Sequence, residues 1–143
     1  RFLHEKVKEK SKQYYKNKDY YSAFIEALKK YSDDVKFKSG STVTPDSSLM
    51  GNVFNNSRGT DFLSVIGNYK KQDGRDFTQD TISNVQNGQQ YLSQGIVWAG
   101  RNPLAHEEIE ELNKSDLFSE KDCLDLLSLL SHLYKRLDNS IKV

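Results

Sequence analysis

Apolar side chains recur every three or four residues through most of this 143-residue chain, and this spacing predicts helices. The clearest set lies on one predicted helix: Tyr21, Phe24, Ala27, Leu28, Tyr31 and Val35. Only Phe62–Ile66 has the pattern of a short strand, and no second segment has a pattern that would pair with it. We therefore expect an all-α bundle of four to five main helices, with short connecting helices and at most a vestigial strand.

Capping residues predict where three helices begin. Asp19 follows a turn and has the side chain of an N-cap. Thr44 is placed to cap a short helix with Pro45 at its first position. Ser119 and Asp122 approximate a capping box that opens the last helix.

The two longest C-terminal helices are expected at the centre of the bundle. The third long helix is predicted from about Phe77 to Gly100, with Gln89 interrupting its apolar stripe and Trp98 anchoring its end. Gly88 and Gly95 cost helix propensity, so each is expected to permit close approach of another helix or a ligand. The last helix is apolar over more than half its circumference, through the following residues: Cys123, Leu124, Leu126, Leu127, Leu129, Leu130, Leu133, Tyr134, Leu137 and Ile141.

Length and composition predict one cytoplasmic domain over residues 1–143. One cysteine cannot crosslink a fold, and no apolar run approaches the ~20 residues that span a membrane. Because the sequence begins at Arg1 rather than at a methionine, further native residues are expected outside it.

The net charge of +1 hides an asymmetry: residues 1–38 carry eleven Lys/Arg and six Asp/Glu, whereas residues 107–143 carry five and nine. The basic end could attract phosphates or simply be a solvated helix face.

The segment Arg101-Asn102-Pro103-Leu104-Ala105-His106 combines three chemically useful side chains with a proline. The proline disfavours a helical residue before it, so the incoming helix should end near Gly100 or Arg101 and a new turn should carry His106. Such a break would let Arg101, Asn102 and His106 converge on one ligand. The alternative is structural: Arg101 caps its own helix, Asn102 makes a turn and His106 starts a helix.

This segment resembles the R-N-P-x-A-H element of the Ymh-type family of uncharacterised bacterial and phage-associated proteins, in the HEPN superfamily. The glycine-containing helix before it, the Leu49-Met50-Gly51-x-x-Phe54 segment and the Ala23-Phe24-Ile25-Glu26-Ala27 segment are similar as well. The resemblance spans roughly Tyr14 to Leu137. It implies a HEPN-like helical domain that acts as a dimer with a composite site.

The resemblance also implies a metal-independent endoribonuclease with Arg101, Asn102 and His106 as catalytic residues and no cofactor. Imidazole is the side chain whose pKa suits a general base near neutrality, and guanidinium can meet charge gathering on phosphorus. The expected products are a 2′,3′-cyclic phosphate and a 5′-hydroxyl, which would fit a toxin or phage-defence effector. The substrate-binding candidates are the basic residues of the polar segment that follows the predicted strand: Lys70, Lys71 and Arg75.

One histidine per site leaves the departing oxygen without an acid, so we expect a two-fold homodimer with the active site at its interface. The apolar surface of the last helix could serve this contact. An antitoxin-like or regulatory partner is a further expectation.

Two other functions remain open: a non-catalytic module that binds RNA, nucleotide or protein, and a purely structural interaction domain. Asp73, Asp76 and Asp80 lack the spacing of a calcium loop and instead suit the start of a helix, so no metal is expected there. Cys123 is expected to be a packing residue.

Overall fold

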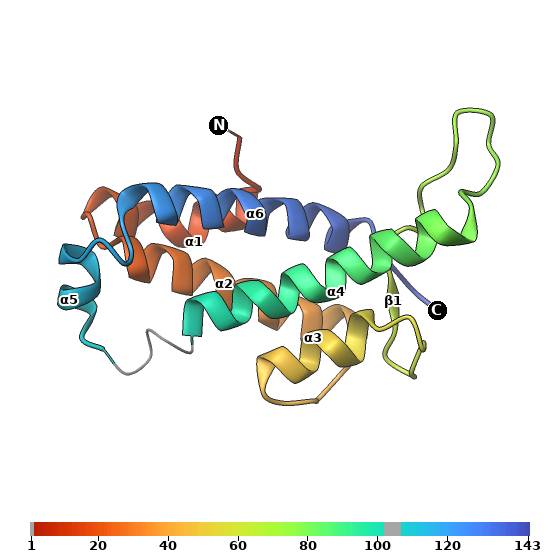
Figure 1. Cartoon of the computed structure of the whole chain (residues 1–143), viewed down its shortest axis with the longest axis horizontal. Coiled ribbons are helices and arrows are strands. Elements are labelled where there is room, and N and C mark those ends of the chain that lie inside the picture. Colours follow the sequence, from red (N-terminus) through yellow and green to blue (C-terminus); the bar gives the residue numbers. More distant parts are fainter. Residues whose placement is uncertain (1, 102–106) are drawn as a thin grey trace.

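The computed structural model describes residues 2–101 and 107–143, and its fold is the expected all-α bundle (Figure 1). Within these ranges, six helices and two short strands follow in the order α1 Glu5–Lys16, α2 Tyr20–Ser39, α3 Asp46–Phe54, β1 Leu63–Ser64, α4 Gln79–Arg101, α5 Ile109–Lys114, α6 Glu120–Asp138 and β2 Ile141–Lys142. None of the described helices is both long and apolar enough to cross a membrane.

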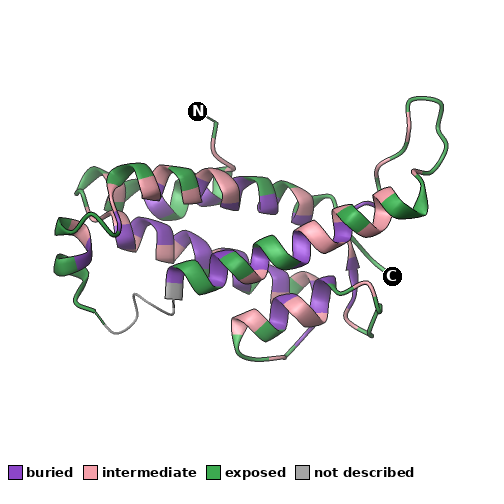
Figure 2. Ribbon diagram, in the orientation of Figure 1, coloured by how far each residue is buried: buried purple, intermediate pink, exposed green. Residues whose placement is uncertain are grey.

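Helix α2 is the centre of the bundle, and it contacts α1, α3, α4, α5 and α6. It can do so because its apolar residues, among them Ala23, Phe24, Ala27 and Tyr31, are fully buried on more than one side (Figure 2). The expectation that the third long helix and the last helix form the centre is therefore wrong. Helix α6 packs its apolar residues inside the bundle, and no exposed large hydrophobic side chain in the described residues lies on it.

Two of the three predicted caps are confirmed. The carboxylate of Asp19 accepts from the N–H of Ser22 at 3.2 Å, and Ser119 and Asp122 form the reciprocal capping box. Thr44 is not an N-cap, because Pro45 is itself extended and the helix begins one residue later, at Asp46. The difference is within the usual uncertainty of helix boundaries.

The predicted strand exists, but its partner was not predicted. Leu63 and Ser64 pair antiparallel with Lys142 and Ile141 at the end of the chain. Ile141 was expected on the last helix, yet α6 ends at Asp138. A strand of two residues has too few positions to show an alternating pattern, which explains why the sequence does not reveal it.

Two buried glutamines explain the interrupted stripe of α4. The Gln89 amide donates to the Tyr31 hydroxyl at 2.9 Å and to the Leu133 carbonyl at 3.1 Å, which joins α4 to α2 and α6. The Gln86 amide donates to the carbonyls of Phe54 and Leu63, while its oxygen accepts from the N–H of Val65. Both side chains therefore satisfy polar groups inside the core and fix α4 in place.

Candidate active site

The end of α4 is held tightly against α2. A Cβ at Gly100 would lie 2.6 Å from Phe24 Cε2 and 2.8 Å from Leu28 Cδ2, so only glycine allows this approach. The buried hydroxyl of Tyr21 donates to the Gly100 carbonyl at 3.2 Å. Helix α4 is helical up to Arg101, the last described residue before the candidate catalytic segment. The backbone that leads into this segment is thus fixed at its last described turn.

The catalytic prediction itself falls largely outside the described residues. Asn102 and His106 lie outside them, as does the side chain of Arg101. The convergence of the three side chains on one ligand stays a prediction. The structure describes the residues on either side of the segment.

The second flank returns to the same turn of α2. Asn113 on α5 accepts from the backbone N–H of Tyr21 at 3.1 Å and donates to Asp19 at 2.8 Å. Tyr21 therefore bonds to the residue before Arg101 through its hydroxyl and to α5 through its backbone. The described residues on both sides of the Arg101–His106 segment, Gly100 before it and Asn113 on α5 after it, therefore contact the same tyrosine.

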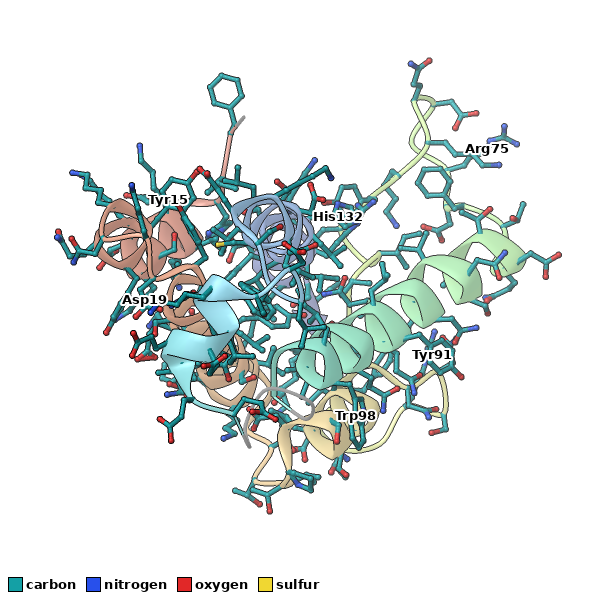
Figure 3. All side chains as sticks on the ribbon, turned by 60° about the vertical axis from the view of Figure 1, so that its left-hand side comes forward. Tyr15, Asp19, Arg75, Tyr91, Trp98 and His132 are labelled. Carbon is teal, nitrogen blue, oxygen red and sulfur yellow. The ribbon has the colours of Figure 1, made fainter. Side chains whose placement is uncertain are left out.

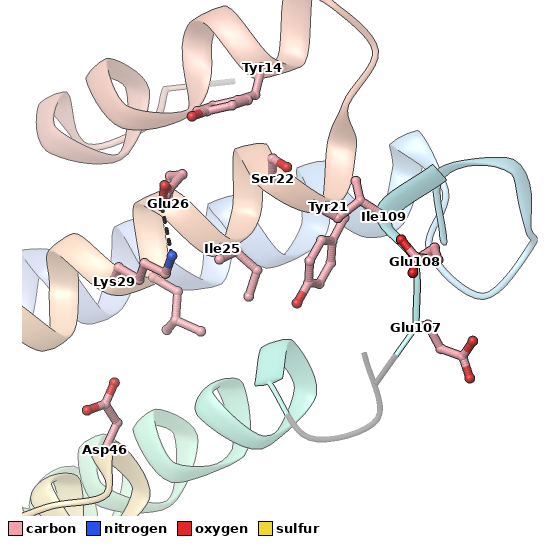
Figure 4. A pocket seen from close by; sticks show the side chains of 11 residues that line it. Tyr14, Tyr21, Ser22, Ile25, Glu26, Lys29, Asp46, Glu107, Glu108 and Ile109 are labelled. Carbon is pink, nitrogen blue, oxygen red and sulfur yellow. Dashed lines mark ion pairs between the residues drawn. The ribbon is translucent and has the colours of Figure 1, made fainter. Parts of the chain in front are cut away.

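A cavity of about 590 Å³ lies beside these flanks (Figure 4). Its walls come from α1, α2, the start of α3 and the residues that lead into α5, and they are formed by Tyr14, Tyr21, Ser22, Ile25, Glu26, Leu28, Lys29, Asp46, Glu107, Glu108 and Ile109. The cavity is half apolar, and it lies on the side of the bundle where α4 ends (Figure 4). A ligand in it would be close to the candidate catalytic segment.

The charge of this cavity is mainly negative. Glu26, Asp46, Glu107 and Glu108 supply four carboxylates, whereas Lys29 is the one cation among the described lining residues and lies 3.4 Å from Glu26. Carboxylates repel phosphate, so the described lining residues do not by themselves favour an RNA backbone.

The predicted substrate-binding residues lie at the other end of α4. Lys70, Lys71 and Arg75 belong to the loop before Gln79, and the 23 residues of α4 separate this loop from Arg101 by about 33 Å (Figure 1). Lys70 forms an ion pair with Asp76, and Arg75 pairs with Asp73 at 2.7 Å. Within one chain the structure does not bring these cations to the candidate catalytic segment.

The two other reactive side chains considered, Cys123 and His4, take part in packing and hydrogen bonding within the fold. Cys123 is buried, and its burial raises the pKa of the thiol to about 12, so it is not a nucleophile at neutral pH. His4 stacks on Tyr134 and bonds to Asp138 at 2.6 Å. Within residues 2–101 and 107–143, no group of three His, Cys, Asp or Glu residues is arranged to hold a metal ion.

Sequence patterns did not identify three residues that shape the site. Tyr21 was assigned to the core from its helical spacing, and its hydroxyl was the one sign of a polar role. Gly100 looked like a helix terminator, whereas it is a close-packing position. Asn113 carries no local signal, because its bonds to Asp19 and Tyr21 join segments more than ninety residues apart.

Comparison with protein families gives a match over residues 1–137 to the family described as "Protein of unknown function (Hypoth_ymh)". Comparisons with curated proteins and with solved structures gave no match.

Proposed function

The chain belongs to the Hypoth_ymh family of proteins of unknown function, and from that premise we propose that it is a metal-independent endoribonuclease. Its catalytic groups would be Arg101, Asn102 and His106. The observation that carries the proposal is the double anchor at Tyr21, which bonds to both flanks of this segment. A catalytic constellation must be held in place by its surroundings, and the anchored flanks supply that support.

The proposed reaction needs no external nucleophile. His106 takes the proton of the RNA 2′-hydroxyl, the O2′–P bond forms and the P–O5′ bond breaks. Arg101 meets the negative charge on the phosphoryl oxygens with paired donors, and the Asn102 amide orients the phosphate. The departing 5′ oxygen takes a proton from an acid, which leaves a 2′,3′-cyclic phosphate and a 5′-hydroxyl.

The similarity to HEPN domains supports this chemistry, and it also supports a homodimer with the active site at its interface. A nuclease of this kind would serve as a toxin or phage-defence effector. Growth arrest on expression, relieved by Arg101→Ala or His106→Ala, is the expected cellular consequence.

Cleavage of total RNA in EDTA tests the proposal. The wild type should cleave, whereas His106→Ala should lower the rate about 10²–10⁴-fold and Arg101→Ala about 10²–10³-fold. Each variant is compared at equal folded concentration, checked by circular dichroism. Absence of cleavage by the wild type, or equal cleavage by both variants, would contradict the proposal.

The acidic cavity favours a second candidate, a non-catalytic module that binds a basic protein segment such as an antitoxin-like partner. Four carboxylates beside Ile25 and Ile109 suit a chain that carries both cationic and apolar residues. Glu107→Lys with Glu108→Lys would then abolish partner binding, while RNA cleavage by the wild type would be absent.

A further inference from the structure

One face of α4 is apolar along three turns, and it is exposed except at Gly88, which is half-buried. Six residues form this face, and we call it the α4 face: Gly88, Tyr91, Leu92, Gly95, Trp98 and Ala99. Tyr91 is 64% exposed and Trp98 54% exposed, and both extend from the outer side of the helix (Figure 3). We expected Trp98 to anchor the end of the helix in the core, and this expectation is wrong because the side chain is more than half exposed.

The helix that carries the α4 face has no charge over twenty consecutive residues, from 81 to 100, although 29% of the whole chain is charged. A helix face that meets water usually carries charged side chains. Depletion of charge together with enrichment in Tyr and Trp is typical of the core of a protein interface. The composition of α4 therefore indicates a contact surface.

The two glycines of the α4 face make no close packing contact with the described residues. A Cβ at Gly88 or Gly95 would meet no atom within 4 Å, so neither glycine serves packing within the described residues. Each costs the helix about 1 kcal/mol relative to alanine. A side chain of another molecule that packs against the bare backbone at both positions would explain why the helix carries glycine there.

The order of the large and small residues is self-complementary. In a two-fold contact, residue i meets residue j of the partner and j meets i. If two copies of α4 cross antiparallel at the level of Ser93, Trp98 lies opposite the partner's Gly88, and Tyr91 lies opposite the partner's Gly95. A parallel pairing would instead place Trp98 opposite the partner's Trp98 and leave the glycines facing each other.

We infer that the α4 face is the contact surface of an antiparallel two-fold homodimer, in which Trp98 and Tyr91 of each copy pack on Gly88 and Gly95 of the other. This arrangement fills both glycine positions with an aromatic ring and covers the exposed tryptophan. Opposed helix dipoles favour it as well.

The same register brings the basic loop of one copy to the catalytic end of the other. The two Arg101 residues would lie about 24 Å apart along the helices, and the start of each α4 would lie just beyond the partner's Arg101. Lys70, Lys71 and Arg75 of one copy then approach the end that carries Glu107 and Glu108 in the other.

The contribution of this loop to RNA binding rests on the proposed function. The ion pairs that Lys70 and Arg75 make with Asp76 and Asp73 are exposed, so a phosphate can displace the carboxylates. The loop would add cations beside the mainly acidic described lining of the cavity, and a lysine from it would supply the proton for the departing 5′ oxygen. The second copy would thus bring an ammonium group rather than a second imidazole.

Sedimentation from micromolar to millimolar concentration tests the dimer. The wild type should be dimeric, whereas Trp98→Ala and Gly95→Leu should be monomeric with unchanged helix content. Phe37→Ala is the matched control, because Phe37 is a 91% exposed aromatic residue on α2 and should be dispensable for dimerisation. A monomeric wild type, or dimers that persist in both α4 variants, would overturn the inference.

Single cysteines test the register. Residues 92 of the two copies would be offset by about 3 Å along the helices and residues 99 by about 18 Å, so Leu92→Cys should form an interchain disulfide and Ala99→Cys should not. The wild type is the background control, because its Cys123 is buried. Cross-linking of Ala99→Cys instead would indicate parallel helices and overturn the register.

Mixing two inactive variants tests the shared site. Arg101→Ala is combined with a variant in which Lys70, Lys71 and Arg75 are all alanine. If the site is shared, each mixed dimer has one intact site, and random mixing should restore about a quarter of the wild-type cleavage. No restoration would overturn the role of the partner's loop. If the wild type itself cleaves no RNA, the proposed function fails, while sedimentation and cross-linking still decide the dimer.

Discussion

Tyr21 and Gly100 are joined by a hydrogen bond of 3.2 Å, from the tyrosine hydroxyl on α2 to the last carbonyl before Arg101. The backbone N–H of the same tyrosine donates to Asn113 on α5. One residue therefore contacts both Gly100, just before the candidate catalytic segment, and Asn113 on α5, which follows it. Changes at this point should affect activity more than they affect the rest of the fold.

Tyr21→Phe tests this coupling. The substitution removes the bond to Gly100 and keeps the ring, so the free energy of unfolding should fall by about 1 kcal/mol. RNA cleavage should fall several-fold, because the backbone before Arg101 loses its anchor. Tyr14→Phe is the control, since it removes a hydroxyl from the same cavity wall and should change neither quantity. Equal cleavage by Tyr21→Phe and the wild type would show that the hydrogen bond from Tyr21 to Gly100 does not contribute to activity.

Gly100→Ala should destabilise the protein although alanine favours helices. The new methyl group would overlap Phe24 and Leu28, and overpacking of this kind costs about 1–3 kcal/mol. Gly95→Ala is the matched control, because its Cβ meets open space and should stabilise α4 by about 1 kcal/mol. Urea unfolding of both variants in the Trp98→Ala background removes dimerisation from the comparison. Opposite signs are expected, and a stabilising Gly100→Ala would show that the contact with α2 is loose.

Gln86→Leu should be among the most destabilising substitutions on α4. It leaves the buried N–H of Val65 and the carbonyls of Phe54 and Leu63 without their partner, at a cost of about 3 kcal/mol or more. Gln90→Leu is a matched control, because the one contact of the Gln90 amide with the described residues is a long 3.4 Å contact with Gln94. Urea unfolding that gave similar losses for the two variants would contradict the assigned role of Gln86.

Asp34 gives the fold a sensitivity to acid. Burial of Asp34 opposes its ionisation, but hydrogen bonds from Tyr134, Lys6 and Lys30 outweigh it and hold the pKa of Asp34 below its usual value. Its contribution is therefore fully present above the unfolded pKa of about 4 and is lost as the pH falls through the lower folded pKa.

Tyr134→Phe tests this contribution, because it removes the 2.5 Å hydrogen bond from the Tyr134 hydroxyl to Asp34. The free energy of unfolding at pH 7 should fall by about 1.5 kcal/mol. The difference from the wild type should shrink as the pH falls below about 4, because Asp34 is protonated first in the unfolded chain and then, at its lower pKa, in the folded protein. Unfolding curves between pH 7 and pH 2 measure it, and a difference that is constant with pH would exclude Asp34 as the cause.

The sequence predicted the fold where one local pattern determines structure. The apolar spacing of α2, the cap at Asp19 and the capping box at Ser119 and Asp122 are local features, and the structure contains all three. It did not predict the pairing of β1 with β2, or the bonds of Gln89, because these depend on segments far apart in the chain. The central position of α2 is likewise a property of the assembled helices.

The candidate site was predicted less completely than the fold. Helix α4 reaches Arg101, and the break that the proline predicts after it lies outside the described residues and stays a prediction. The anchoring by Tyr21 and Asn113 could not be predicted, since no local pattern marks a tyrosine that bonds to two distant segments. The exposure of Trp98 contradicts the general tendency of tryptophan to be buried, and it supports the proposed contact surface on α4.

The central claim is that the protein cleaves RNA by making the 2′-hydroxyl of the RNA attack the neighbouring phosphate. The most direct measurement uses an RNA oligonucleotide that contains a mapped cut site, and a matched oligonucleotide with one 2′-deoxy nucleotide on the 5′ side of that bond, both in EDTA. We predict cleavage of the first to a 2′,3′-cyclic phosphate and a 5′-hydroxyl, and no cleavage of the second at that bond. Cleavage of the deoxy-substituted bond, or products with 5′-phosphate ends, would contradict the proposed mechanism.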